Sequence, residues 1–279
     1  MQALPKVLLA SQPDGLRKAL RRRWAHLRRA SQWRRGAAIA FAVLVTLVTA
    51  GLVFRSPKPL MRTTSPRDQP LATVHHGFLP PAQFERVSRI SNAQIDGALD
   101  ADTLDGYISG WMVKFNRRGL ERVRAMELYA DAVPYLEAVL VNESNAFVLN
   151  TVVAKEPAPG ADAVNAHFDN TVAIREQGIF LAHQVNVLYV SLPDRMEGGQ
   201  LEVWPMEFED SEYGKAVIHP LENMMVEFRG DAGHRVRGFR SPSGGKRVSL
   251  VLEQYRIPRS SYGNTVDFCQ GQECMEEVV

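Results

Sequence analysis

Cysteine is scarce in this chain, which has only two in 279 residues. Cys269 and Cys274 stand close together near its end, in the segment CQGQEC. Two thiols alone do not make a structural zinc site, because such sites need four ligands. In an oxidising lumen, the pair would instead form a small disulfide. The apolar fraction of 45% and the charged fraction of 23% are those of an ordinary globular protein.

Acidic residues are almost missing from residues 1–36, which hold ten Lys and Arg against one acid, Asp14. The segment therefore carries a charge of +9, and the rest of the chain carries −7 within the total of +2. Two parts so different in charge belong in different surroundings. Trp24 and Trp33 lie among the arginines, as in some nucleic-acid-binding arms. We favour contact with anionic lipid and expect no nucleic-acid partner, because an apolar helix follows.

Charge and proline are both absent from residues 36–54, GAAIAFAVLVTLVTAGLVF. A helix rises about 1.5 Å per residue, so this segment just spans a hydrocarbon core of about 30 Å. The segment fits neither of two alternatives. A buried core helix would show a polar face, and a cleaved signal peptide has a shorter apolar region.

The basic flank is far heavier before this helix than after it, which keeps residues 1–35 in the cytosol. We expect a single-pass type II membrane protein, with residues 36–54 as a transmembrane signal anchor and the catalytic domain in the ER or Golgi lumen. The alternative is a transit peptide that leads to a mitochondrial or plastid membrane, because residues 1–35 are rich in Arg and poor in acids.

Proline reappears in residues 55–72, which contain four prolines and few apolar residues, and we expect a linker or stalk there. The folded domain is expected at 73–260, followed by a C-terminal tail at 261–279 whose polar end, residues 270–279, is expected to fray. Asn142 begins a glycosylation sequon, Asn-Glu-Ser.

Strand patterns dominate the domain. Strands are expected at 74–79, 111–115, 147–154, 179–192, 201–204, 224–228 and 248–252. Helices are expected at 83–90 and 120–140, the second kinked or broken by Pro134. The sequence therefore predicts a mainly β fold with flanking helices, a double-stranded β-helix (jelly roll) preceded by one transmembrane helix.

Histidine and aspartate are paired once, in the segment AHFDN at 166–170. On an extended backbone, residues two apart point to the same face, so His167 and Asp169 project together. A third ligand from another strand would complete the two-histidine, one-carboxylate face of non-haem Fe(II) oxygenases. None of the other six histidines has an Asp two places on.

Further candidates lie in residues 224–255. His234 follows one apolar run, and Lys246 and Arg247 precede the next, across a Gly-rich and hairpin-like connection. One side chain could hold a metal and the other an anion in a shared pocket. A surface histidine and a basic turn would give the same pattern.

Taken in order, these segments resemble the 2-oxoglutarate- and Fe(II)-dependent dioxygenases, and most closely their prolyl-4-hydroxylase-like branch. The resemblance covers residues 73–258, and type II membrane-anchored members of that branch also fit the N-terminal segment. Its motifs are His167-x-Asp169, LYVS at 188–191, GG at 198–199, VEFRGDAGHRV at 226–236 and GKRVSL at 245–250.

The resemblance implies iron ligands His167, Asp169 and His234, with His219 as a competing distal ligand. It also implies that Arg247, with Ser249 two places on, grips the far carboxylate of 2-oxoglutarate. Tyr189 would donate to the same carboxylate, and Lys246 is the alternative cation. A guanidinium holds a carboxylate with two parallel hydrogen bonds, which a Lys cannot do.

The implied cofactors are Fe(II), 2-oxoglutarate and O₂, with ascorbate as reductant. The implied reaction hydroxylates a substrate carbon and decarboxylates 2-oxoglutarate to succinate. A peptide or protein substrate oxidised at a residue such as proline leads, and a small molecule remains possible. Residues 149–166 lack the family's upstream Tyr, and Val248 replaces an aromatic residue, which weakens the case for proline.

Two other functions stay open. The domain could be a non-catalytic, membrane-anchored jelly-roll binding module with a degenerate metal site. It could also be a metal-dependent enzyme of the cupin type that does not use 2-oxoglutarate, which would leave Arg247 without a role.

Overall fold

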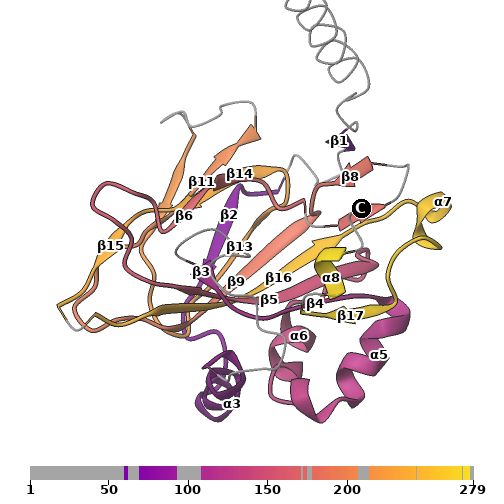
Figure 1. Ribbon diagram of the computed structural model, residues 1–279, viewed down its shortest axis with the longest axis horizontal. Helices are drawn as coiled ribbons and strands as arrows, with labels where there is room; N and C mark the ends of the chain where they lie inside the picture. The colour runs from indigo at the N-terminus through magenta and orange to yellow at the C-terminus, as the bar shows by residue number, and fades with distance from the viewer. Residues whose placement is uncertain are drawn as a thin grey trace, which may run out of the picture. The chain divides into compact units, whose positions relative to one another are not determined.

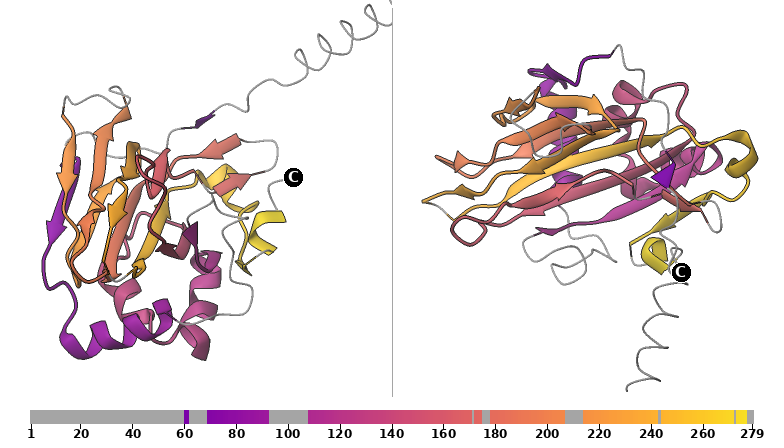
Figure 2. Two further views of the ribbon diagram at one scale, coloured as in Figure 1. Left: turned by 60° about the vertical axis from the view of Figure 1, so that its left-hand side comes forward. Right: turned by 90° about the horizontal axis from the view of Figure 1, so that it is seen from above.

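Two antiparallel sheets stacked face to face form the core of the domain (Figures 1 and 2). The computed structural model describes residues 60–61, 69–92, 108–170, 172–174, 178–206, 214–242, 244–271 and 273–276, all within one compact unit that begins at Lys58. The expected basic tail, membrane anchor and most of the linker lie outside these residues. No helix in the described ranges is long and apolar enough to cross a membrane.

The large sheet has the order β17-β4-β5-β16-β9-β13-β2, with β3 paired to β5. Its strands are β2 (Ala72–His75), β3 (Ile108–Ser109), β4 (Met112–Asn116), β5 (Ala146–Ala154), β9 (Gln184–Ser191), β13 (Met225–Arg229), β16 (Arg247–Tyr255) and β17 (Phe268–Gln270).

The small sheet has the order β12-β11-β14-β6. Its strands are β6 (Val164–His167), β11 (Leu201–Pro205), β12 (Ala216–Ile218) and β14 (Ala232–Val236). Two short pairings complete the β structure: β10 (Glu197–Gly198) with β15 (Phe239–Arg240), and β1 (Leu60–Met61) with β8 (Gly178–Phe180) and β7 (Val172–Ile174). The fold is mainly β and antiparallel, consistent with the expected jelly roll.

Strand β16 lies between β5 and β9 and is covered on both faces. Val248, Leu250 and Leu252 pack in the core between the large sheet and the helices. The alternate residues, from Arg247 onward, face the space between the sheets, as the two-residue period of a strand requires. This alternation makes β16 one wall of the site.

Helices cover the face of the large sheet opposite the small sheet (Figure 1). They are α3 (Pro81–Asn92), α5 (Arg117–Ala125), the 3₁₀ turn η1 (Glu127–Tyr129) and α6 (Val133–Val139). The helical segment expected at 120–140, kinked or broken by Pro134, is found broken, although the break precedes Pro134. The segment divides, and Pro134 stands in the first turn of α6, where its missing N–H costs no hydrogen bond.

The strand expected at 179–192 is also interrupted. It divides into β8 and β9, and residues 181–183 turn between them. Ala182 N donates to Asp169 O, and His183 N donates to Gln254 O. The interruption thus ties the chain just after β6 to the large sheet, directly beside the histidine-aspartate pair.

The hairpin-like connection expected between the runs at 224–228 and 248–252 is wrong, because β9 lies between β13 and β16. After β13 the chain turns at Gly230 and Asp231 and enters the small sheet as β14. A Cβ on Gly230 would lie 2.0 Å from Ala182 O, so only glycine fits this turn. The two runs belong to one sheet, but His234 lies in the other.

The C-terminal residues are held by the domain more tightly than a frayed tail. β17 pairs with β4, and the short helix α8 (Glu273–Glu276) follows α7 (Arg259–Tyr262) and β17. Cys269 and Cys274 form a disulfide, and Lys114 Nζ donates to Cys274 O at 2.8 Å.

Candidate metal and anion site

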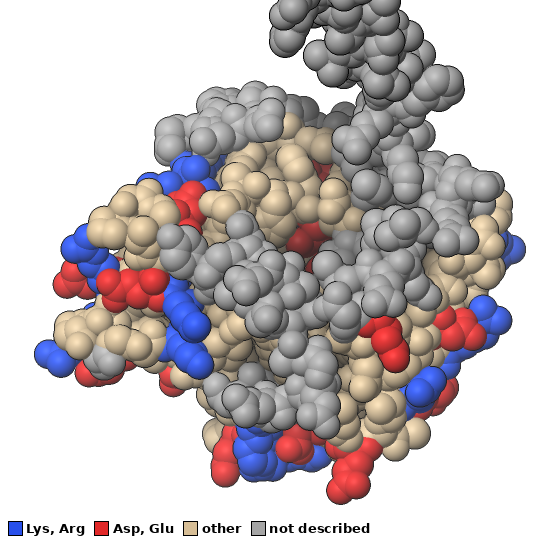
Figure 3. Space-filling view, in the orientation of Figure 1, with Lys and Arg blue, Asp and Glu red and all other residues tan. Residues whose placement is uncertain are grey.

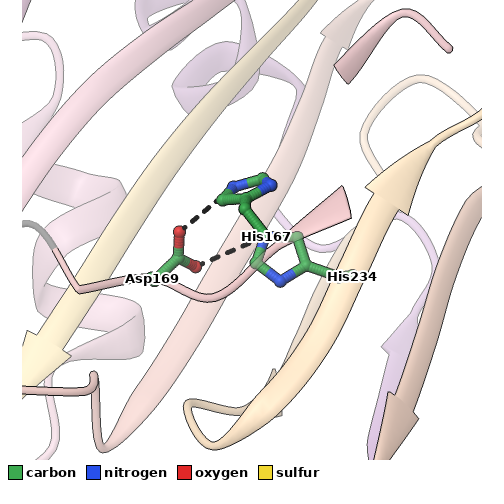
Figure 4. Close-up of side chains that lie close together, drawn as sticks. All are labelled: His167, Asp169 and His234. Atoms are coloured by element: carbon green, nitrogen blue, oxygen red, sulfur yellow. Dashed lines mark ion pairs between the residues drawn. The ribbon is translucent and has the colours of Figure 1, made fainter. Parts of the chain in front are cut away.

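The structure brings His167, Asp169 and His234 together (Figure 4). His167 and His234 are direct cross-strand partners on β6 and β14, with ring centroids 4.2 Å apart. Asp169 follows β6, with Oδ1 3.5 Å from His167 Nε2 and Oδ2 3.5 Å from His234 Nε2. Potential ligand atoms from all three lie within 4.8 Å of one another.

The backbone orients both imidazoles. His167 Nδ1 lies 2.8 Å from Asn165 O, and His234 Nδ1 lies 3.4 Å from Ala232 O. A proton on Nδ1 that faces a carbonyl leaves the lone pair on Nε2, the atom turned toward Asp169. The local structure therefore presents two Nε2 atoms and one carboxylate to the same point.

Packing fixes the distal histidine. The Phe228 ring lies 4.8 Å from the His234 ring, centroid to centroid, from the large sheet. The residue before His234 is Gly233, where an added Cβ would lie 2.5 Å from Trp204 Nε1. β14 can approach β11 this closely only because residue 233 is a glycine. The position of the adjacent His234 therefore depends on that glycine.

The three groups titrate differently. Burial opposes protonation of His167, but its pairing with Asp169 outweighs burial and raises its pKa to about 9. Burial lowers the pKa of His234 to about 4 despite the charge of Asp169. Burial would raise the pKa of Asp169, yet the two histidines hold it below its ordinary value. The cluster thus holds one carboxylate, one neutral imidazole and one protonated imidazole.

The donor set fits a divalent transition metal. Asp169 is 8% exposed, and its Oδ2 accepts no hydrogen bond from the residues described. A buried carboxylate oxygen without a hydrogen bond is costly, and a cation between the three side chains would satisfy it. Two imidazoles and one carboxylate on one face are the ligands of non-haem Fe(II), with other coordination positions left open.

A buried cation lies in the same cavity. Arg247 is 1% exposed and its Nη1 donates to Ser249 Oγ at 3.2 Å, while its guanidinium lies 4.9 Å from the centre of the Tyr189 ring. Within the described ranges, Arg247 Nε and the Tyr189 hydroxyl have no hydrogen-bond partner. Burial lowers the pKa of Arg247 and raises that of Tyr189. This combination suits a carboxylate ligand.

One cavity of about 450 Å³ joins the two features. The cluster His167, Asp169 and His234 and the pair Arg247 and Ser249 all line it. In Figure 3, acidic atoms lie in a recess whose described border is formed by residues other than Lys, Arg, Asp and Glu. The arrangement can hold a metal and an anionic ligand in one enclosed space.

The competing candidates lie elsewhere. His219 is exposed after β12, and neither it nor the exposed His75 and His76 joins the cluster. Lys246 is also exposed, because the strand alternation that buries Arg247 turns its neighbour outward.

The sequence analysis gave no role to several polar and aromatic cavity residues, among them Trp111, Asn150 and Glu253. Glu253 had a usable signal, since it stands at an even spacing from Arg247 and Ser249 on one strand. Trp111 and Asn150 carry no such signal, because nothing in the sequence places β4 and β5 beside β16.

No model of a protein family matches the chain, and no curated protein matches it. Among solved structures, it is similar to a Pseudomonas putida prolyl-4-hydroxylase, at 17% identity and a TM-score of 0.43 over 67% of this chain and 92% of that one. It is also similar to an oxidoreductase of the 2OG-Fe(II) oxygenase family from Burkholderia pseudomallei, at 11% identity and a TM-score of 0.43 over 75% and 99% of the two chains.

A third similar structure is dioxygenase for auxin oxidation 1 from Arabidopsis thaliana in its complex with 2-oxoglutarate, at 12% identity and a TM-score of 0.44 over 73% and 99%. All three likenesses have TM-scores below 0.5.

Proposed function

We propose that this protein is an Fe(II)- and 2-oxoglutarate-dependent dioxygenase that hydroxylates a substrate carbon and converts 2-oxoglutarate to succinate. The observation that supports the proposal is a single cavity with a His-Asp-His cluster in one part and the buried Arg247 in another. A metal site alone would need no buried cation. An anion site alone would need no clustered ligands.

The roles of the residues follow from their positions. His167, Asp169 and His234 would hold Fe(II) through two Nε2 atoms and a carboxylate. Arg247 would bind the far carboxylate of 2-oxoglutarate through two parallel N–H donors, with Ser249 orienting the guanidinium and Tyr189 donating its hydroxyl proton.

Bound Fe(II) with 2-oxoglutarate and O₂ would supply the oxidising chemistry. The chain's own contribution is ligand geometry, an anion clamp and exclusion of water. The apolar walls of the cavity, Val185, Val187 and Val251, serve the last role.

We further propose that the substrate is a peptidyl residue such as proline, with a small molecule as the alternative, and that ascorbate acts as reductant. The type II topology and lumenal location expected from residues 1–54 belong to the same proposal. The membrane anchor would hold the domain in the lumen through which secreted peptides pass.

Succinate release tests the proposal. The full chain is incubated with Fe(II), ascorbate and 2-oxoglutarate, and succinate is quantified with and without candidate peptides. Binding of 2-oxoglutarate to the Mn(II)-loaded protein is measured in parallel by calorimetry. Metal-dependent 2-oxoglutarate binding with slow uncoupled succinate release is expected.

The other outcomes separate the alternatives. Metal binding without 2-oxoglutarate binding would favour an enzyme of the cupin type. Neither metal nor 2-oxoglutarate binding would favour a non-catalytic module. Either result overturns the proposal.

A further inference from the structure

Asn150 carries a buried hydrogen-bond acceptor that the described residues leave unsatisfied. Its Oδ1 atom is one of six buried side-chain N or O atoms without a hydrogen-bond partner in the described part of the chain. The proposed function already gives a ligand to three of the other five, those of Asp169, Arg247 and Tyr189. The last two belong to residues that do not line the cavity, Ser144 and Trp204. Asn150 lines the cavity, and its acceptor has no ligand so far.

Neighbours on β16 fix the orientation of the Asn150 amide. Its Nδ2 donates to Glu253 Oε1 at 3.4 Å, and the Tyr255 hydroxyl donates to Oε2 of the same carboxylate. The reverse orientation of the amide would place its oxygen against the carboxylate, so that two acceptors would face each other. Oδ1 therefore points away from Glu253 and is left as an acceptor for a ligand.

Strand register places Asn150 in an apolar row on the inner face of the large sheet. Asn150 is the cross-strand partner of Met112 on β4 and of Val251 on β16, and Val251 pairs with Val187 on β9. All four side chains line the cavity, and Asn150 is the polar one among them. An amide oxygen cannot neutralise a charge, and a charge buried among apolar side chains is unfavourable. This acceptor therefore suits a neutral donor.

The row that contains Asn150 lies between the two ligand sites. On β16, Val251 stands between Arg247 at one end of the strand and Glu253 nearer the other. The charge of Glu253 contributes to the raised pKa of His167, which places that part of the strand near the cluster. Neighbouring strands lie about 4.8 Å apart, so Asn150 lies about one strand spacing to the side of β16. A ligand held at both the cluster and Arg247 would have Asn150 to its side, where a second molecule can bind.

The fold alone does not require an acceptor at position 150. A buried polar atom without a hydrogen bond is unfavourable, and an apolar side chain of similar size, such as leucine, would avoid this cost. The residues two places away on the same face of β5, Val148 and Val152, are both apolar. A donor that comes with a ligand explains the acceptor better than packing does.

We propose that Asn150 is a specificity-determining residue, and that its carbonyl oxygen accepts a hydrogen bond from an amide N–H of the substrate next to the carbon that is oxidised. The inference rests on the proposed function, because it assigns the substrate end of that site. An amide N–H is the neutral donor that a peptide carries at each residue except proline. Where proline is oxidised, the N–H of an adjacent residue supplies the donor.

Matched amide and ester probes test the inference without metal or 2-oxoglutarate. N-methylacetamide and methyl acetate have nearly the same shape, but only the amide has an N–H. The peptide arm compares a blocked Gly-Ala-Gly tripeptide with the analogue in which an ester oxygen replaces the N–H of alanine. The two arms distinguish a small amide from a peptide as the source of the donor.

Nuclear magnetic resonance of the full chain with isotope-labelled asparagine reports binding at Asn150 itself. The side-chain signal of Asn150 is identified by its absence from Asn150→Leu. We expect at least one amide to shift this signal, with an affinity about threefold to tenfold higher than that of its ester, as one buried hydrogen bond warrants. This comparison needs only the wild-type protein, so it decides the matter even if a variant does not fold.

Two variants locate the preference, with affinities measured by saturation transfer to the methyl signals of the probes. Asn150→Leu removes the acceptor, so the preference for the amide should vanish while affinity for the ester stays within about twofold. Asn142→Leu replaces an exposed asparagine in the turn before β5 and should keep the preference. Circular dichroism and melting temperature establish that each variant is folded.

The results distinguish this inference from the proposed function. Equal affinity of the wild type for amides and esters, no shift of the Asn150 signal with either amide, or an unchanged preference in Asn150→Leu would overturn the assignment of Asn150, whatever the succinate assay gives. A preference that depends on Asn150 in a protein that never binds 2-oxoglutarate would overturn the proposed function and leave the amide site in place.

Discussion

The metal cluster (His167, Asp169 and His234) and the anion pocket (Arg247 and Ser249, beside Tyr189) share one cavity, but their charges are compensated differently. In the cluster, Asp169 lies 3.5 Å from a nitrogen of each histidine, so opposite charges meet within the protein. Arg247 has a hydroxyl and an aromatic ring beside it, and no ion pair with any described acid. The charges of the cluster are therefore balanced before a metal binds. The positive charge of Arg247 in the anion pocket is balanced only when an anionic ligand binds.

This difference predicts what each ligand does on binding. A metal must displace a proton from His167 and break an existing ion pair. A carboxylate at Arg247 only adds an interaction, because a buried and uncompensated charge is unfavourable. The four predictions below test this contrast, beginning with the largest expected effect.

Removal of one cluster ligand should abolish tight metal binding. His167→Ala leaves one imidazole and one carboxylate, and we expect affinity for Mn(II) or Fe(II) to fall by at least about 100-fold, more than is typical for loss of an outer-shell partner. The measurement is metal titration by calorimetry. His219→Ala is the matched control, because this histidine is exposed and lies apart from the cluster. Equal losses in both variants would contradict the cluster assignment.

A substitution in the anion pocket should give the second-largest effect, a loss of 2-oxoglutarate affinity. Arg247→Ala should weaken 2-oxoglutarate by about 100-fold, with metal affinity nearly unchanged, since truncating one partner of a buried charge pair costs about 2–5 kcal/mol. The KM for 2-oxoglutarate and its dissociation constant report the change.

Lys246→Ala is the control one residue away and should stay within about twofold, because its side chain is exposed. If Lys246→Ala lost affinity and Arg247→Ala kept it, the assignment of the clamp would be wrong by one residue.

The titration of His167 should make the metal-free protein less stable as pH rises. Its folded pKa of about 9 exceeds the ordinary 6.5, so the ion pair stabilises fully below about pH 6.5 and is lost as pH rises through about 9. Because 41% of the His167 side chain is exposed, solvent screening reduces the expected change to about 1 kcal/mol.

Saturating Mn(II) should reverse this dependence, because the metal needs the neutral imidazole and competes with protons at low pH. Urea unfolding from pH 7.5 to 9.5, with and without metal, measures both slopes above the range in which the lowered pKa of His234 affects stability. His75→Gln, far from the cluster, should retain them. A metal-free protein whose stability rises over this range would contradict the ion pair between His167 and Asp169.

Much of the site was predictable from the sequence because it depends on the two-residue period of strands. That period paired His167 with Asp169 and favoured Arg247 over Lys246, and in the structure the first two lie 3.5 Å apart while Arg247 is buried and Lys246 is exposed. The expected helix at 83–90 is confirmed by α3, and the expected strands at 111–115 and 147–154 are confirmed by β4 and β5.

What could not be predicted depends on long-range packing. The apolar run at 179–192 gives no sign that Ala182 and His183 leave the strand to bond Asp169 and Gln254. The even spacing of Glu253 from Arg247 indicates its face of the strand, but the donors from β5 and Tyr255 that hold it there come from long-range packing. The short segment FCQ becomes strand β17 by pairing with the edge of β4.

Substitution of Ser249 should have the smallest of these effects, on 2-oxoglutarate binding. Its hydroxyl accepts from Arg247 Nη1 and orients the guanidinium without supplying charge. Ser249→Ala should weaken 2-oxoglutarate by about threefold to tenfold, because a single buried hydrogen bond contributes about 0.5–1.5 kcal/mol. The KM for 2-oxoglutarate should rise while metal affinity is kept.

Ser241→Ala is the matched control, because its hydroxyl bonds Asp194 O away from the cavity. A loss as large as that of Arg247→Ala would mean that Ser249 contacts the ligand itself. No loss at all would mean that the Tyr189 ring alone holds the guanidinium in place.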